Sequence, residues 1–240
     1  MSDDTMICEH LKAVQAEIAA ARRRRRKALA DAPVELIAVT KNHSVDAMRE
    51  AIDAGVMNIG ENRVQEALDK AETLEREVKW HLIGHLQTNK VKYIAPFIHM
   101  IESVTSERLL LEICRQAQRV GRTIPILLEV HVAREETKSG FSPDELRELL
   151  GRIASSPEAY RGVALYGLMA MASNVDDESV IRGEFATVHR LFDEIRSSGV
   201  LLQPELFTEL SMGMSGDYPL ALREGATLVR VGSAIFGDRA

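Results

Sequence analysis

The sequence predicts an α/β protein that folds as one closed (β/α)₈ TIM barrel, and three observations carry this prediction. Short apolar runs alternate with charged amphipathic stretches eight times, as in a parallel sheet covered by helices. The 240 residues suit one large core and no linker-like stretch divides them, so a single domain is expected over residues 1–240. Neither G-x-G-x-x-G nor G-x-x-x-x-G-K-[ST] occurs, which disfavours the alternative, an open doubly wound sheet with a nucleotide site.

A long helix is expected before the first strand. From Thr5 to about Leu29, apolar residues recur at helical spacing and neither Gly nor Pro interrupts the pattern. Pro33 ends this helix because proline has no amide hydrogen to donate. Residues 34–40 then form a short, largely apolar run, which is typical of a strand buried on both faces.

The pairing of a strand with a following helix continues along the chain. Each unit joins a short apolar run to a charged amphipathic stretch that is expected to cover it. The first seven predicted strands, each with the helix that follows, are 34–40 with 45–54, 57–60 with 62–77, 80–84 with 88–95, 98–102 with 106–120, 124–131 with 142–154, 162–170 with 178–198, and 207–212 with 217–224. The eighth predicted strand is 227–232. In such a barrel, catalytic and binding side chains lie at or just after the C-terminal ends of the strands.

Cysteine usage and hydropathy predict a cytoplasmic protein. Cys8 and Cys114 are far apart in the sequence without a C-x-x-C motif, and the N-terminus lacks the apolar core of a secretory signal. Cys114 falls on the apolar face of a predicted helix, where a role in the core is expected. The longest stretch of apolar residues and glycine, 163–172, is far shorter than the roughly 18 residues of a membrane span, so no membrane partner is expected.

Charge is distributed unevenly along the chain. Residues 1–30 carry seven Lys or Arg against four acids, a net charge of +3 within a chain of net charge −6. The run Arg22–Arg26 with Lys27 allows an adaptor for nucleic acid, whose binding would be sensitive to salt. The acidic remainder of the chain opposes polyanions and no aromatic residue interrupts the run, so a solvated helix face is the preferred interpretation.

Lys41 directly follows the first predicted strand. A lysine at a barrel mouth is partly desolvated, which lowers its pKa and frees the amine to form a Schiff base with an aldehyde. A surface lysine at a strand end is the alternative interpretation of this position.

Two segments rich in glycine and serine follow the last two strands, at 211–216 and 231–234. Their glycines allow a ligand to approach the backbone, and their amides and hydroxyls can donate hydrogen bonds to anionic oxygens. The corresponding loops often hold phosphate in these barrels. The segments therefore predict a phosphate site, with ordinary turn glycines as the alternative.

Arg230 lies within the otherwise apolar last strand. A buried guanidinium needs an acceptor, which is either a ligand or a structural salt-bridge partner. Other chemistries find no support: His81 and His85 lack the H-E-x-x-H pattern, and no G-x-S-x-G motif is present. Neither a metal site nor a catalytic nucleophile of these kinds is expected.

Seven segments in order resemble the pyridoxal phosphate homeostasis proteins, which are small relatives of the N-terminal barrel of alanine racemase. The similarity runs from about Val34 to Gly237. The segments are IAVTK (37–41), GENRVQE (60–66), WHLIGHLQTNK (80–90), KSGF (138–141), GLMAM (167–171), SMGMSGD (211–217) and VRVGSAIFG (229–237). The resemblance implies a monomeric fold-type III barrel that holds pyridoxal 5'-phosphate as an internal aldimine, with Lys41 forming the Schiff base.

The resemblance also implies roles for further residues. Asn62 would lie near the cofactor ring, and Arg230 would face its pyridine nitrogen. The phosphate would be held by Ser211, Gly213, Met214, Ser215, Gly232 and Ser233. A guanidinium beside the ring nitrogen disfavours its protonation, which makes the ring a weaker electron sink.

This assignment favours cofactor handling over catalysis. Alanine racemase needs a tyrosine base that comes from a further C-terminal β domain. We expect no such domain in this sequence, and none of the four tyrosines here has the sequence context of that base. The expected function is therefore non-enzymatic pyridoxal phosphate homeostasis, with the cofactor and cofactor-dependent apoenzymes as partners. A racemase-like amino-acid enzyme remains the alternative, followed by a phosphate-binding barrel without a Schiff base.

Overall fold

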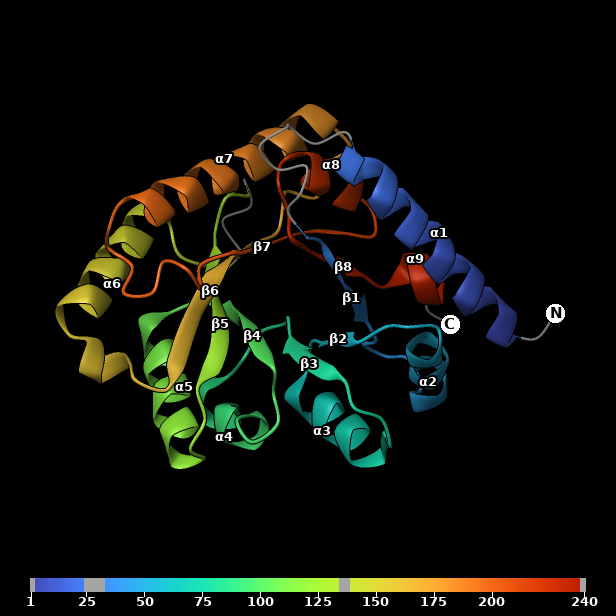
Figure 1. Cartoon of the computed structure of the whole chain (residues 1–240), viewed down its shortest axis with the longest axis horizontal. Helices are drawn as coiled ribbons and strands as arrows, with labels where there is room; N and C mark the ends of the chain where they lie inside the picture. Colours follow the sequence, from blue (N-terminus) through green and yellow to red (C-terminus); the bar gives the residue numbers. More distant parts are fainter. Residues whose placement is uncertain (1–2, 24–32, 134–138, 238–240) are drawn as a thin grey trace.

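The fold is a closed barrel of eight parallel strands, with helices around it (Figure 1). A computed structural model describes residues 3–23, 33–133 and 139–237. The strands pair in chain order, which confirms the predicted (β/α)₈ barrel and shows that the open-sheet alternative is wrong. They are β1 (Glu35–Val39), β2 (Asn58–Glu61), β3 (Lys79–Leu82), β4 (Met100–Val104), β5 (Ile124–Val130), β6 (Val163–Ala170), β7 (Glu209–Met214) and β8 (Leu228–Val231).

The barrel closes where the first strand meets the last. In the parallel pairing of β1 with β8, Ile37 lies opposite Arg230 and Ala38 lies opposite Val231. Between β7 and β8 the register shifts, which is typical of a bulge that redirects neighbouring side chains. This closure places the C-terminal ends of β1, β8 and β7 side by side at one face of the barrel.

Most helices begin and end within a few residues of the predicted positions. Serine side chains cap the first turns of three of them, and Ser142 forms a reciprocal capping box with Glu145. The helices are α1 (Asp3–Arg23), α2 (Val45–Asp53), α3 (Val64–Thr73), α4 (Val91–Ile94), α5 (Glu107–Arg119), α6 (Pro143–Ser155), α7 (Glu178–Ser197), α8 (Tyr218–Arg223) and α9 (Ser233–Phe236), with 3₁₀ turns η2 (Thr88–Lys90) and η3 (Pro157–Tyr160).

Two helical segments differ from the prediction. Residues 88–95 form a 3₁₀ turn and one turn of α-helix instead of a continuous helix, because no side chain caps the start and Pro96 cannot continue the hydrogen-bond pattern. The four residues of α9 are too few to produce a helical periodicity in the sequence.

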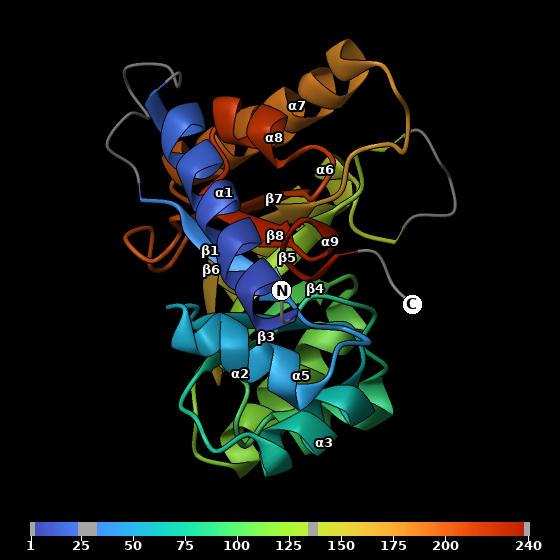
Figure 2. The ribbon, with the colours of Figure 1, turned by 90° about the vertical axis from the view of Figure 1, so that its right-hand side faces the viewer.

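The N-terminal helix packs on the side where the barrel closes. Figure 2 shows α1 in front of the barrel between α2 and α8, and it also contacts α9. Leu11, Val14 and Ile18 are buried in these contacts. Of the arginine run, Arg22 and Arg23 end α1, whereas 24–32 lie outside the described residues.

Cys114 provides a test of the packing around α5. Its side chain is 1% exposed, and burial raises the pKa of its thiol to about 12. Because the thiolate is the reactive form, Cys114 should resist thiol reagents in the folded protein, while the partly exposed Cys8 reacts. A chromogenic disulfide reagent should therefore titrate one thiol in the native protein and two after denaturation. The Cys8→Ser variant should titrate none while folded, and reaction of Cys114 in the native protein would contradict this packing.

Candidate functional site

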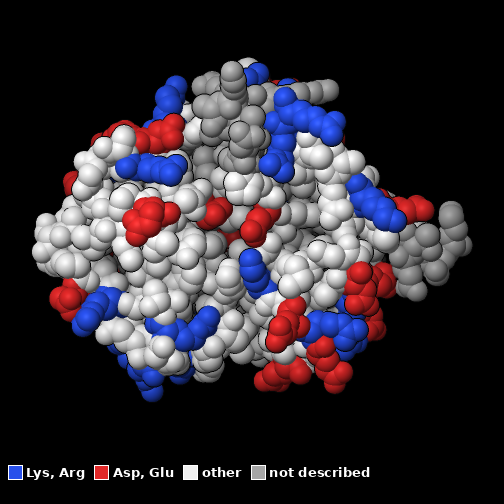
Figure 3. Space-filling model, in the orientation of Figure 1, with Lys and Arg blue, Asp and Glu red and all other residues white. Residues whose placement is uncertain are grey.

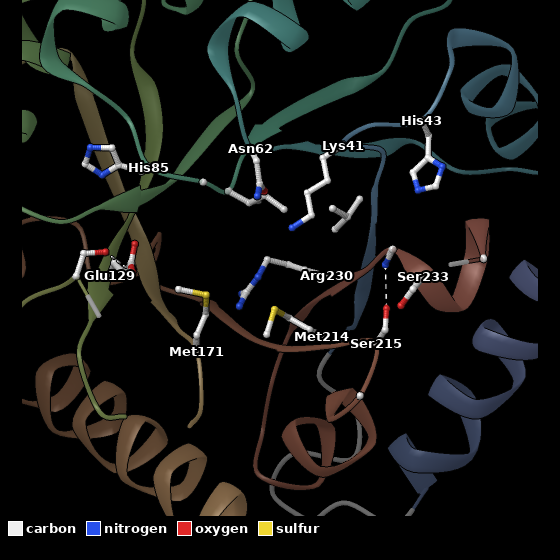
Figure 4. Close-up of a pocket in the computed structure, with 17 residues that line it drawn as sticks. Lys41, His43, Asn62, His85, Glu129, Met171, Met214, Ser215, Arg230 and Ser233 are labelled. Carbon is white, nitrogen blue, oxygen red and sulfur yellow. Dashed lines mark hydrogen bonds between the residues drawn. The ribbon is translucent and has the colours of Figure 1, made fainter. Parts of the chain in front are cut away.

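A cavity of about 650 Å³ opens at the C-terminal ends of the strands. Residues from most of the barrel contribute to its wall. Arg230 lies at the centre of the cavity, Ser215 and Ser233 lie at one end, and Glu129 lies at the other (Figure 4). Its lining consists of Val39, Lys41, His43, Asn62, Ile83, Gly84, His85, Glu129, Ser139, Met171, Met214, Ser215, Gly216, Arg230, Gly232, Ser233 and Gly237.

Lys41 enters this cavity from the end of β1, on the side of Arg230 (Figure 4). The residues on either side of it are anchored to α3. The carbonyl of Thr40 accepts a hydrogen bond from Lys70 Nζ at 2.6 Å, and the Asn42 amide donates to Glu66 Oε1 at 2.5 Å. Asn42 has a φ of +62°, a left-handed conformation that asparagine tolerates better than most residues. The backbone around Lys41 is therefore fixed from both sides.

A buried ionic cluster provides this anchor. Lys70 Nζ lies 2.7 Å from both Glu61 Oε1 and Glu66 Oε1. The hydroxyl of Thr40 also donates to Glu61, at 2.5 Å. Burial raises the pKa of Glu61, although the hydrogen bonds from Lys70 and Thr40 oppose this effect. The amine of Lys70 is thus held by carboxylates beneath the loop, while that of Lys41 extends into the cavity.

Removing the cation of this cluster should destabilise the fold. The Lys70→Met variant would leave two carboxylates without their shared partner, so its free energy of unfolding should fall by about 3 kcal/mol. Lys79, which is 45% exposed and lies 4.0 Å from Glu35, is the control. The Lys79→Met variant should lose less than about 1 kcal/mol. Urea unfolding measures both values, and equal losses would contradict a stabilising role for the cluster.

Hydroxyls and backbone amides gather at one end of the cavity. Ser215 Oγ accepts hydrogen bonds from the amides of Gly232, at 3.1 Å, and Ala234, at 3.4 Å. Ser215 and Ser233 lie close together there (Figure 4). A Cβ atom at position 232 would come within 3.3 Å of Val39, so glycine lets the segment after β8 pass tightly over β1. The hydroxyls of Ser215 and Ser233 can donate hydrogen bonds here to an anionic oxygen group.

Asn62 lies on the side of Lys41 away from Ser215 (Figure 4). It is held by a close approach to Gly84, where a Cβ atom would lie 2.5 Å from the Asn62 carbonyl oxygen. The Gly84 carbonyl in turn accepts a hydrogen bond from Ser103 Oγ at 2.6 Å. Gly84, which lies between His81 and His85 in the sequence, therefore shapes the wall of the cavity.

Arg230 occupies the centre of the cavity, near Met171 and Met214 (Figure 4). Its side chain is buried, and its two terminal nitrogens donate to Ser211 Oγ at 2.6 Å and to the Ala170 carbonyl at 2.9 Å. The guanidinium is consequently held by barrel residues and still borders the cavity.

The structure brings most of the predicted site residues together. Ser211 and Gly213 do not line the cavity. Ser211 lies behind Arg230, and Gly213, at a φ of +91°, brings the backbone so close to α8 that a Cβ would lie 2.7 Å from Tyr218 Cα. Both fall in the irregular part of β7, which the sequence pattern does not reveal. The predicted residues that line the cavity are Lys41, Asn62, Met214, Ser215, Arg230, Gly232 and Ser233.

Sequence reasoning missed Glu129, which lies on the opposite side of Arg230 from Ser215 (Figure 4). Its buried side chain accepts a hydrogen bond from Ser139 Oγ at 3.2 Å, and burial raises the pKa of its carboxyl. The sequence does contain a signal for this residue, because Glu129 is a charged residue within an otherwise apolar strand, as Arg230 is. Glu129 lies within the strand, whereas the candidate sites were sought at or just after the strand ends.

The remaining surface offers no simple alternative site on the face in Figure 3. Among the described residues on that face, basic and acidic side chains are interspersed, without the continuous positive area that a nucleic-acid interface requires. Within the described residues, no three or more His, Cys, Asp or Glu side chains are grouped to hold a metal ion. No helix in the same part of the chain is both long and apolar enough to cross a bilayer.

Comparison with known proteins identifies the family. The family model for the alanine racemase N-terminal domain matches residues 10–240. A pyridoxal phosphate homeostasis protein of Aquifex aeolicus is 37% identical over 206 residues, covering 85% of this chain and 87% of the relative. The chain belongs to the pyridoxal phosphate homeostasis protein family. A member from Helicobacter pylori is 36% identical, covering 85% of this chain and 88% of its own.

Solved structures agree with this membership. PipY of Synechococcus elongatus, in a structure described as having PLP bound, is 34% identical with a TM-score of 0.81. The similarity covers 96% of this chain and all of that one. Alanine racemase of Streptomyces lavendulae is 19% identical with a TM-score of 0.68, covering 95% of this chain and 58% of the racemase, which shows a shared fold.

Proposed function

We propose that this protein binds pyridoxal 5'-phosphate through a Schiff base to Lys41 and serves in pyridoxal phosphate homeostasis. One observation carries the proposal: the amine of Lys41 and the donors around Ser215 and Gly232 open into the same cavity, with Arg230 between its two ends. The names of the relatives and the cofactor described for PipY support it.

The cavity residues fit the three recognisable parts of this cofactor. When bound, pyridoxal phosphate supplies an aldehyde that condenses with an amine, the group that Lys41 presents. The hydroxyls of Ser215 and Ser233 would hold the phosphate, with Gly232 allowing its close approach to the backbone and Met214 beside them. Asn62 would contact the ring, and Arg230 would face the pyridine nitrogen.

We infer that the protein binds the cofactor without catalysing amino-acid chemistry. Arg230 disfavours protonation of the ring nitrogen and so weakens the ring as an electron sink. A racemase also needs a second acid or base across the substrate, and none of the four tyrosines lines the cavity. Tyr160 and Tyr218 donate their hydroxyls to Glu107 and Glu17 elsewhere. Release of the α-proton of an amino acid would favour the racemase alternative.

The setting and partners follow from the same proposal. Both cysteines are free thiols, which suits a reducing cytoplasm. We infer a monomer, the state that the resemblance to the family implies. The partners would be pyridoxal phosphate itself and the apoenzymes that require it.

Covalent attachment at Lys41 is the first prediction. Borohydride reduction of the protein after incubation with pyridoxal phosphate should leave a phosphopyridoxyl group on the peptide containing Lys41, identified by mass spectrometry. The Lys41→Ala variant should lose both the yellow colour and the adduct, because the attacking amine is gone. Lys79→Ala should keep both, since Lys79 is a surface residue outside the cavity. An unmodified wild-type protein that still binds inorganic phosphate would favour the phosphate-binding barrel.

The phosphate end can be tested separately. Removing the Ser215 hydroxyl should weaken pyridoxal phosphate binding about tenfold, since one hydrogen bond to a charged group is lost. The same Ser215→Ala variant should bind pyridoxal, which lacks the phosphate, nearly as well as the wild type. Ser139→Ala, at the other end of the cavity, should not change the preference for the phosphorylated form. An equal loss of both ligands in Ser215→Ala, measured by fluorescence titration, would place the phosphate elsewhere.

A further inference from the structure

A chain of buried polar side chains leads from Arg230 into the barrel interior, away from the cavity. Arg230 donates to Ser211 Oγ at 2.6 Å, and Ser211 Oγ donates to Glu102 Oε2, also at 2.6 Å. The other oxygen of Glu102 lies 2.7 Å from His81 Nδ1. These residues come from β8, β7, β4 and β3, and none is more than 3% exposed. Four strands therefore contribute one residue each to this hydrogen-bonded chain, and of the four residues Arg230 alone lines the cavity.

The carboxylate of Glu102 sets the direction of these hydrogen bonds. An ionised carboxylate only accepts, so the single proton of the Ser211 hydroxyl must point to Glu102. The oxygen of Ser211 is then free to accept from Arg230. The Ala170 carbonyl takes a second bond from the guanidinium, and two acceptors on different nitrogens fix its plane. Glu102 thereby determines the orientation of a group that it does not contact.

The charges around Arg230 support this arrangement. Burial raises the pKa of Glu102, but the hydrogen bond from His81 and the charge of Arg230 outweigh it and hold that pKa below its ordinary value. Besides Glu102 on β4, the acids whose charges act on Arg230 are Glu129 on β5 and Asp217 before α8. Isolated buried charges cost several kcal/mol, so a carboxylate placed behind the cavity needs the partners it has here.

We propose that Glu102 is a positioning residue, which acts through Ser211 to hold the Arg230 guanidinium toward the ring nitrogen of the bound cofactor. This inference rests on the proposed function. Glu102 lies outside the cavity lining. It would keep a fixed positive charge beside the ring, and so determine how readily the bound cofactor gains a proton.

The Glu102→Gln variant would remove the carboxylate that sets the direction of these hydrogen bonds. With His81 facing one end of the amide, its NH₂ group would face Ser211 and donate to it, so the serine proton would no longer have its acceptor. The guanidinium of Arg230 would then no longer be held toward the ring nitrogen, so its positive charge would oppose protonation of the bound cofactor less strongly. The pH midpoint of the visible spectral change should consequently rise by about 1 on the pH scale.

The experiment compares this midpoint among variants loaded with pyridoxal phosphate. Glu224→Gln is the matched control, because Glu224 is also a buried carboxylate paired with an arginine, Arg182, but on the outside of the barrel. It should leave the midpoint unchanged. In an Arg230→Met background, Glu102→Gln should cause no further change, since its effect passes through the guanidinium. The Ser211→Ala variant breaks the hydrogen-bonded connection without altering charge, and it should also shift the midpoint. It replaces Glu102→Gln as the test if that variant does not fold.

The outcomes separate the inference from the function on which it rests. A wild-type protein that gains no visible band with pyridoxal phosphate overturns both. A wild type that binds, with Glu102→Gln and Ser211→Ala titrating like it, overturns the inference alone. A Glu102→Gln effect that persists in Arg230→Met also overturns it, because Glu102 would then act directly as a charge rather than by positioning Arg230.

Discussion

The parallel pairing of β1 with β8 is the contact on which the site depends. It places Arg230 opposite Ile37, and it brings Gly232 over Val39, two residues before Lys41. Lys41 and the segment around Gly232, which lie at opposite ends of the barrel sequence, thus become neighbours in one cavity. An open sheet with the same elements would leave its first and last strands apart, so the chemistry of this protein follows from closure of the barrel.

Two buried ionic groups flank the site, and each holds a residue that faces the cavity. The cluster around Lys70 anchors the backbone on both sides of Lys41, and Glu102 orients Arg230 through a serine hydroxyl. Buried charges seldom favour stability over an apolar alternative. Their placement directly behind Lys41 and Arg230 connects them with the proposed cofactor site, since the geometry of both residues depends on them.

Much of the fold and part of the site could be predicted from the sequence. Buried parallel strands are short and apolar, so their alternation with amphipathic helices was visible, and strand ends then identified Lys41 and Gly232. The positions of Ser211 and Gly213 were not predictable, because the bulge in β7 changes which side chains face the cavity. The connection of Ser211 to Glu102 joins residues 109 positions apart, a contact that no local pattern encodes.

The most direct test is a crystal structure of the protein grown with pyridoxal phosphate. We expect density continuous with Lys41 Nζ, the phosphate between Ser215 and Gly232, and Arg230 within hydrogen-bond distance of the ring nitrogen. The Glu102–Ser211–Arg230 connection should be unchanged behind it. Cofactor attached to another lysine, or a phosphate at the Glu129 end of the cavity, would contradict the proposed site.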